Sequence, residues 1–188
     1  ERYLSDPKHL NVFNGKAVVF EGPEDYHKRL NDKKLKIDEN SILIVRGCGP
    51  VGYPGAAEVV NMQPPDRLLK KGIRHLPTLG DGRQSGTSES PSILHVSPES
   101  AVGGDLGLVK TGDKMKIDLN KRRVDLLISK AEFAKRRKNR KVFKFINQTP
   151  WQEIFRNTVG QLEDGACINS RGQYLDVSHT KGLPRDSH

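Results

Sequence analysis

The chain has 188 residues, of which 34% are hydrophobic and 29% are charged, and these proportions fit one soluble globular domain with or without a tail. They exclude a collagen-like, coiled-coil or fully disordered chain. The net charge is +9, and the segment 130–144, with eight basic residues and one acid, carries seven of these charges. A local excess of this kind raises the question of a nucleic-acid or anionic partner.

The sequence shows no sign of a membrane or secretory segment. No stretch approaches the roughly 18 consecutive apolar residues of a membrane span, and the first ten residues, ERYLSDPKHL, lack the apolar core of a signal peptide. We therefore expect a cytoplasmic protein with no membrane partner. Cys48 and Cys167 form no CxxC pair, which supports neither a disulfide framework nor a structural zinc site. The first residue is Glu1 rather than Met, as in a fragment or a trimmed chain.

The first half of the chain alternates short strands with short helices. Apolar runs at 16–20 (KAVVF) and 41–46 (SILIVR) predict strands, and the second has the continuous apolar character of a strand buried on both faces. Residues 24–30 predict a helix, with acids in the first turn and basic residues in the last. Residues 64–71 predict a second helix, because prolines begin this segment and a glycine follows it.

Two glycine-rich loops interrupt this pattern. They are GCGPVGYPGAAE at 47–58 and GDGRQSGTSESP at 80–91, and each follows a short apolar segment. Rigid scaffolds commonly present functional sites on loops placed in this way.

From residue 92 to 129 the sequence favours short strands at roughly ten-residue spacing. The segments SILHV, LGLVK, KMKIDL and RVDLLIS are separated by turn signals, and this spacing is typical of a β-barrel or sandwich. Ser129 is a good N-cap for a basic helix within 130–144, and 151–162 predicts a further helix. We therefore expect a β-rich α/β fold: a β-barrel domain with flanking helices over 1–144 and a C-terminal helix with a polar tail over 145–188.

Taken one at a time, the polar residues of the two loops favour structural roles. The loop at 47–55 lacks the GK[ST] ending of a phosphate-binding loop. Ser85 is not in a G-x-S-x-G motif, since Arg83 occupies the position of the first glycine, and it reads as a turn residue. Glu58 reads as an acid at a helix N-terminus rather than a ligand for a hard cation.

Two further features also have simple structural readings. His95 lies within an apolar segment, where a hydrogen-bonded core histidine is favoured over a metal ligand. The basic segment 130–144 has few aromatic residues among its charges, Phe133 and Phe143, so it favours a solvated helix face over a nucleic-acid surface.

Taken together, three ordered motifs resemble a known family. GCGPVGYPGAAE, GDGRQSGTS and HVSPESAVGGDLGLVKTGD are similar, in order and spacing, to the C-terminal domain of the family that contains dihydroxy-acid, phosphogluconate and sugar-acid (aldonate) dehydratases. The resemblance covers about residues 16–137, and TPWQEIFRNTVGQLEDGA in the tail adds to it. GRQSGTS and WQEIF are more similar to the sugar-acid enzymes. The resemblance implies a β-barrel of the swivelling-domain type.

The resemblance also implies an activity and roles for three residues. Family members are hydro-lyases that convert a sugar acid or 2,3-dihydroxy acid into a 2-keto acid, using Mg²⁺ and an iron-sulfur cluster. It places a magnesium ligand at Glu58, the base that removes the C2 proton at Ser85, and a further active-site hydroxyl at Thr87. Such a base is physically reasonable, because a bound cation stabilises an alkoxide as it acidifies bound water. Where the family has GMPE this chain has GAAE, which keeps the glutamate.

The family's cluster cysteines and remaining magnesium ligands belong to a larger N-terminal domain that is absent from this chain, so the resemblance implies half an active site. We expect the isolated chain to be inactive. Its expected partners are the acid substrate, the N-terminal domain of the same enzyme and further copies in a homo-oligomer, with no nucleic acid. The alternative is a non-catalytic β-barrel that binds a small acidic ligand or a protein. A third hypothesis, nucleic-acid binding through 130–144, would show as steeply salt-dependent binding.

Overall fold

The structure is a computed structural model that describes residues 11–55, 62–83 and 90–168. These residues form six strands and eight helical segments, of which four are short 3₁₀ helices. The strands are β1 (Val12–Glu21), β2 (Ser41–Arg46), β3 (Thr78–Gly80), β4 (Ser92–Ile93), β5 (Lys114–Asp118) and β6 (Arg123–Leu126). The α-helices are α1 (Pro23–Arg29), α2 (Asp66–Leu69), α3 (Lys130–Lys138) and α4 (Pro150–Thr158). The 3₁₀ helices are η1 (Lys33–Leu35), η2 (Ser100–Val102), η3 (Asp105–Leu108) and η4 (Leu162–Asp164).

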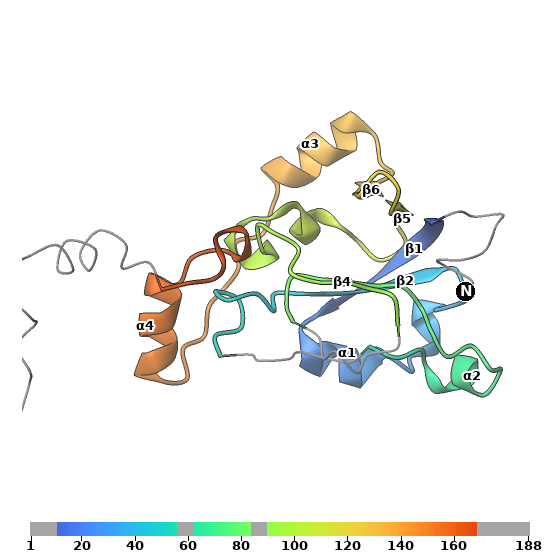
Figure 1. The fold of residues 1–188 in the computed structure, drawn as a ribbon, viewed down its shortest axis with the longest axis horizontal. Coiled ribbons are helices and arrows are strands. Elements are labelled where there is room, and N and C mark those ends of the chain that lie inside the picture. The colour runs from blue at the N-terminus through green and yellow to red at the C-terminus, as the bar shows by residue number, and fades with distance from the viewer. Residues whose placement is uncertain (1–10, 56–61, 84–89, 169–188) are drawn as a thin grey trace, which may run out of the picture.

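All six strands belong to one mixed sheet with the order β4-β3-β2-β1-β5-β6 (Figure 1). Strands β1 to β4 are parallel, whereas β5 pairs antiparallel with β1 and with β6. The predicted strand SILIVR is found at Ser41–Arg46 and is almost wholly buried, as its continuous apolar character indicated. The carboxyl ends of the four parallel strands therefore meet at one edge of the sheet.

Two apolar clusters cover the two faces of the central strands. Because side chains alternate along a strand, Leu43 points to one face of β2 and Ile44 to the other. The first face packs against Tyr26 of α1 and Leu68 of α2. The second face packs against the strands β3 and β5 and against η3, so the sheet encloses part of its own core.

The sheet curls into a half-barrel rather than a closed barrel. Side chains of β4 and β5, from the two halves of the sheet, line one small apolar cavity of about 150 Å³. Within the described residues β4 and β6 are nevertheless the free ends of the strand order. The predicted combination of helices and strands is confirmed as a mixed α/β fold, whereas the predicted β-barrel is present only in part, as this curled half-barrel sheet.

Other predicted elements differ in part. Residues 106–110 were expected to form a strand, but Leu106 and Leu108 are buried within the 3₁₀ helix η3. The reason is the preceding pair Gly103-Gly104. Gly103 has φ 100°, a conformation that favours glycine, and Gly104 lies so close to the backbone of Pro98 that a side chain would not fit there. The chain therefore turns before residue 106 instead of continuing as an extended strand. The three-residue strand β3 was not predicted.

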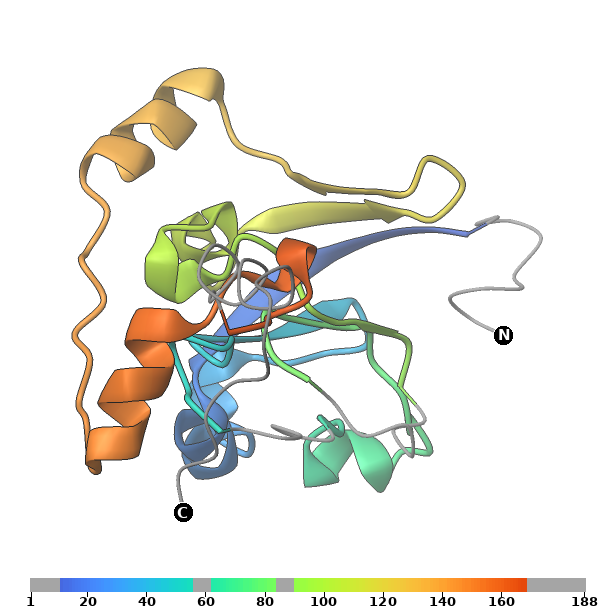
Figure 2. The ribbon, with the colours of Figure 1, turned by 60° about the vertical axis from the view of Figure 1, so that its left-hand side comes forward.

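The basic helix and the tail helix lie outside the sheet. Ser129 caps α3 as predicted, accepting a hydrogen bond from Glu132 N at 3.1 Å. Figure 2 shows the extended segment that follows α3 running along one side of the molecule to α4. The helix within 130–144 ends at Lys138, and the helix predicted at 151–162 ends at Thr158. In the described ranges, no helix is long and apolar enough to cross a membrane.

Candidate active site

The two glycine-rich loops leave the sheet from adjacent parallel strands. Strand β2 ends at Arg46 and β3 ends at Gly80, and the register pairs Val45 with Gly80. Because the strands are parallel, both loops begin at the same edge of the sheet. The described beginnings of the loops, 47–55 and 81–83, therefore lie side by side at the carboxyl edge, where open α/β sheets commonly bind ligands.

A buried carboxylate joins the beginnings of these two loops. Asp81 is 0% exposed, and its two oxygens accept hydrogen bonds from Cys48 N at 2.9 Å and from Gly47 N at 3.1 Å. Ser100 donates to the same carboxylate through its backbone N at 2.9 Å and its hydroxyl at 2.5 Å. A buried carboxylate needs such donors in place of water. Asp81 therefore holds the loop after β2 against the loop after β3.

A second buried carboxylate holds the middle of the first loop. Glu99 is 0% exposed and accepts hydrogen bonds from Val51 N at 2.9 Å and Gly52 N at 2.8 Å. The Gln161 amide donates to Glu99 at 2.9 Å and accepts from Glu99 N at 3.0 Å, which fastens the tail to the loop. A Cβ atom at Gly49 would overlap the Glu99 carboxylate. The glycine at this position thus permits the close approach.

A cavity of about 340 Å³ lies between these loops and the tail. Cys48 and Tyr53 line it from the first loop, Arg83 from the second, His95 from the segment after β4, and Phe155 from α4. The cavity thus draws its walls from segments more than 100 residues apart in sequence.

The thiol and the phenol in this cavity are protonated at neutral pH. Burial, together with the negative charge of Asp81, raises the pKa of Cys48 far above its ordinary value. The Tyr53 hydroxyl donates to Glu24 at 2.8 Å, and this hydrogen bond raises the pKa of Tyr53. Neither group is therefore prepared to act as a nucleophile or a base.

The three residues that the resemblance places in the active site, Glu58, Ser85 and Thr87, lie outside the described residues, so their roles remain predictions. The described chain reaches Gly55 and Arg83, which are three and two residues short of Glu58 and Ser85. Within the described ranges no group of three or more His, Cys, Asp or Glu side chains is arranged to hold a metal ion.

The prediction for His95 is wrong. The residue was expected to be a hydrogen-bonded core histidine within a strand, but it is exposed and has φ 54°. Strand β4 ends at Ile93, and the backbone N atoms of His95 and Val96 then donate to the carbonyls of Gly82 and Gly80 at 3.3 and 3.0 Å. The chain turns here, and the turn places His95 at the wall of the cavity.

Sequence reasoning missed Asp81 and Glu99. Both acids belong to motifs that were singled out, GDGRQSGTS and HVSPES, yet only Ser85 and Thr87 of the first motif received roles. The available signal was an acid beside a glycine-rich loop with no basic residue next to it, because exposed backbone N–H groups are then its natural partners.

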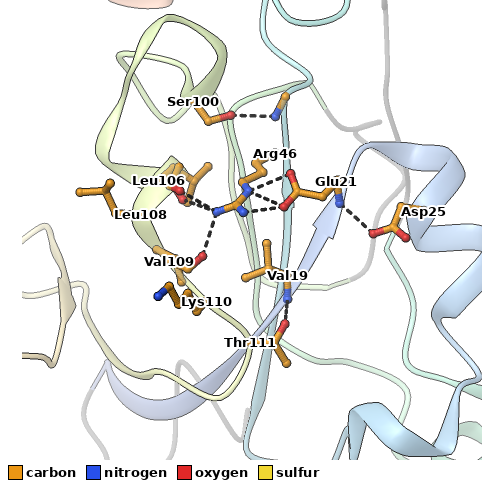
Figure 3. Close-up of polar contacts among 12 residues, drawn as sticks. Val19, Glu21, Asp25, Arg46, Ser100, Leu106, Leu108, Val109, Lys110 and Thr111 are labelled. Atoms are coloured by element: carbon orange, nitrogen blue, oxygen red, sulfur yellow. Dashed lines mark hydrogen bonds and ion pairs between the residues drawn. The ribbon is translucent and has the colours of Figure 1, made fainter. Parts of the chain in front are cut away.

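A second polar network lies at the ends of β1 and β2. The Arg46 side chain pairs with Glu21 and donates to the carbonyl oxygens of Leu106, Gly107 and Val109 at 3.2, 3.0 and 2.8 Å (Figure 3). These contacts fix the segment around η3 against the sheet. Ser100 also accepts a hydrogen bond from Gly47 N at 2.9 Å, which connects the same segment to the glycine-rich loop.

The basic helix is held at the surface by ion pairs. No residue of α3 is buried. Arg136 pairs with Asp113 and Glu132, and Arg137 pairs with Asp105. This is the solvated helix face that the charge pattern predicted.

Comparison with known proteins identifies similar sequences along the whole chain. The family model for the dihydroxy-acid/6-phosphogluconate dehydratase C-terminal region matches residues 4–166. D-xylonate dehydratase of Caulobacter vibrioides is 54% identical over 188 residues, which is 100% of this chain and 31% of that protein. L-arabinonate dehydratase of Rhizobium leguminosarum bv. trifolii is 51% identical over 128 residues, 68% of this chain and 22% of that protein. Dihydroxy-acid dehydratase of Thermodesulfovibrio yellowstonii is 41% identical over 157 residues. The chain thus spans about a third or less of the length of these relatives.

Proposed function

Since the chain belongs to the dihydroxy-acid/6-phosphogluconate dehydratase family, we propose that it is the C-terminal part of a hydro-lyase acting on a sugar acid such as D-xylonate. The product would be the 2-keto-3-deoxy acid. The observation that carries this proposal is the 54% identity to D-xylonate dehydratase across all 188 residues. The arrangement of the two glycine-rich loops at one sheet edge supports it, because a base and the group that activates it must lie close together.

In this proposal Ser85 removes the proton from C2 of the acid, and Thr87 supplies a second hydroxyl at the same site. The reaction removes that proton and the C3 hydroxyl as one water molecule, and the enol that remains becomes the 2-keto acid. Asp81 and the backbone of Gly47 and Cys48 hold the two loops in register. Both loops can then act on one substrate molecule.

The described residues do not by themselves form a site for the family's Mg²⁺ or iron-sulfur cluster. The oxygens of Asp81 and Glu99, the buried acids nearest the loops, already accept hydrogen bonds from N–H and O–H groups. We propose that Glu58 contributes one magnesium ligand and that the other ligands, with those of the cluster, lie in the N-terminal domain. The isolated chain is then expected to be inactive and to bind Mg²⁺ no better than millimolar, because this ion needs several oxygen ligands.

The proposal includes the setting of the chain in the larger enzyme. We propose that the half-barrel is a swivelling domain over residues 1–144, that 145–188 forms a tail, and that the full-length enzyme is a cytoplasmic homo-oligomer. The tail contacts the domain directly, since the Gln161 amide donates a hydrogen bond to Glu99 and Arg156 donates one to the Val51 carbonyl at 2.9 Å. These contacts attach it to the glycine-rich loop.

The experiment that tests the function is turnover by the full-length parent enzyme. The purified enzyme, loaded with iron-sulfur cluster and Mg²⁺, would be given D-xylonate, and 2-keto acid formation would be measured. We expect one keto group for each water lost and no activity from the 188-residue chain alone. Absence of keto acid from a panel of pentonates, hexonates and branched dihydroxy acids would contradict the proposal.

A further inference from the structure

The cavity of about 340 Å³ at the carboxyl edge has the size and composition of a site for a small ligand. Its volume is within the usual range for small-molecule pockets, which begins at roughly 300 Å³. Its walls combine apolar side chains, Phe155 and Leu162, with a few polar ones. The function proposed above gives no role to two of these polar residues, Arg83 and His95.

Arg83 is an exposed arginine whose guanidinium is free to bind a ligand. In the part of the chain that the structure describes, it has no ion pair and no side-chain hydrogen bond. Other arginines near the same edge are fully engaged: Arg46 binds Glu21 and three carbonyl oxygens, and Arg156 donates to Val51 O and stacks over Phe145 at 5.1 Å. Arg83 therefore differs from these arginines in that no described residue forms an ion pair or a side-chain hydrogen bond with it.

His95 is held at the cavity wall by an unusual backbone conformation. Its φ of 54° is uncommon for a residue with a side chain, and the hydrogen bonds of the turn to Gly82 O and Gly80 O maintain it. The same turn brings His95 next to Gly82, the residue before Arg83. The imidazole of His95 has no hydrogen-bond partner among the described residues, and a ring nitrogen is able to donate one in either protonation state.

The other polar groups of the cavity do not compete for an anion or repel one strongly. Asp81 is the one carboxylate among the lining residues that the structure describes, and its oxygens face four N–H and O–H donors. The Cys48 thiol is neutral, and the Tyr53 hydroxyl is bonded to Glu24. Among the described residues that line the cavity, Arg83 is thus the charged side chain that has no ion pair or hydrogen bond.

We propose that Arg83 and His95 form a binding site for a small polyhydroxy carboxylate: Arg83 pairs with the carboxylate, and His95 donates a hydrogen bond to a neighbouring hydroxyl. A guanidinium matches a carboxylate with two parallel hydrogen bonds, which a single ammonium group does not reproduce. The inference rests on the proposed function, since it states how this chain holds the substrate acid.

The test measures binding of a probe that the enzyme is unable to dehydrate. The probe is 2,4,5-trihydroxypentanoate, which lacks the C3 hydroxyl that would leave, and its uncharged amide serves as the second probe. Calorimetry would give the Kd of both for the full-length enzyme and for Arg83→Gln, Arg83→Lys and His95→Gln. The matched control is Arg74→Gln, since Arg74 is an exposed arginine at the opposite end of β3.

Arg83→Gln should weaken binding of the acid about 10- to 100-fold, as expected for loss of a charge-assisted hydrogen bond, and should leave binding of the amide unchanged. The affinity of Arg83→Lys for the acid should lie between those of wild type and Arg83→Gln. His95→Gln should weaken both probes about 3- to 10-fold. Arg74→Gln should bind as wild type, and melting temperatures of all variants should agree within a few degrees.

The outcomes separate this inference from the proposed function. An enzyme that dehydrates D-xylonate while Arg83→Gln and His95→Gln keep wild-type affinity for the acid overturns the inference alone. The same holds if Arg83→Gln weakens the acid and the amide equally, because the charge would then not be recognised. An enzyme that neither dehydrates sugar acids nor binds the probe overturns both.

Discussion

The glycine-rich loop at 47–55 and the basic helix α3 are both dominated by charged contacts, yet the contacts are of opposite kinds. At the loop, the buried acids Asp81 and Glu99 accept hydrogen bonds from backbone N–H groups, and among the described residues no basic side chain pairs with them. At α3, exposed arginines pair with acids in solvent, as Arg137 does with Asp105, whose side chains are 61% and 50% exposed.

The contacts at the loop fix the positions of backbone segments, whereas the charges of α3 mainly face solvent. Backbone N–H groups have no rotamer freedom, so a buried carboxylate that binds several of them fixes the positions of the segments they come from. A surface ion pair loses most of its Coulomb energy to water and must also restrain two long side chains. We therefore expect activity and stability to depend strongly on the loop region and weakly on α3.

The largest difference should appear in catalysis. In the full-length enzyme Ser85→Ala should lower turnover of the sugar acid by about 10² to 10⁴, the usual effect of removing a general base. Ser129→Ala is the matched control in the other region, because it removes the N-cap of α3, costs about 1 kcal/mol of stability and should leave turnover unchanged. Steady-state keto-acid formation and thermal melting would measure both. Near wild-type turnover by Ser85→Ala would show that the base lies elsewhere, with Thr87 the next residue to test.

The next effect should be on stability. Asp81→Asn should lower the free energy of unfolding by about 3 kcal/mol, because the new amide NH₂ group faces the N–H donors of Gly47 and Cys48 or Ser100 and leaves them unpaired. The matched substitution in the basic region, Asp105→Asn, should cost less than about 0.5 kcal/mol. Urea denaturation of the two variants would measure the difference. Equal destabilisation would remove the distinction between the two regions.

Asp81 also shows which structural features the sequence alone does not predict. The strand at 41–46 and the N-cap at Ser129 were predicted with their observed boundaries, because each depends on local chemistry: a continuous apolar run and a hydroxyl before a helix. Whether Asp81 faces solvent or backbone N–H groups depends on Ser100, nineteen residues away. A sequence alone does not contain that pairing.

The parallel pairing of the central strands in the curled sheet was not predicted, for the same reason. Short strands at ten-residue spacing predicted a barrel, and the spacing was right for β5 and β6. The spacing does not state which strand pairs with which, and the central parallel pairing of β1, β2 and β3 depends on partners 20 to 40 residues apart. The segment at 106–110 was predicted as a strand, but its apolar residues fit a strand or a helix equally well. The glycines that precede it favour the 3₁₀ helix that is observed.

A third prediction concerns an ion pair of α3 that is largely buried, between Arg136 and Asp113. The side chains of Arg136 and Asp113 are each 11% exposed. Burial opposes ionisation of Asp113, but the hydrogen bonds from Arg136 and from Lys110 N outweigh it and lower the pKa of Asp113 below its ordinary value of 3.8. Arg136→Met should therefore cost about 1 kcal/mol at neutral pH, between the loop acids and the exposed pairs.

The sign of the pH dependence follows from the lowered pKa. In the unfolded chain Asp113 takes up a proton below about pH 4, whereas in the folded chain it stays ionised to a lower pH. The stabilisation is thus complete above the unfolded pKa and is lost as the pH falls through the folded one. Urea denaturation between pH 7 and 2.5 should show the gap between wild type and Arg136→Met closing below about pH 4. A gap independent of pH would mean that Arg136 acts through its packing alone.

The smallest effect should come from Arg137. Its guanidinium shares Asp105 with Arg140 at 3.1 Å and lies over the Phe133 ring at 5.5 Å, but it is exposed and its partner is half exposed. Arg137→Gln should change the free energy of unfolding by less than about 0.5 kcal/mol at low salt, because water screens the pair and Arg140 keeps the Asp105 contact. In 1 M NaCl, where the Debye length is only about 3 Å, even this difference should vanish. A salt-independent loss above 1 kcal/mol would place Arg137 with the buried acids and would show that α3 helps to hold the fold.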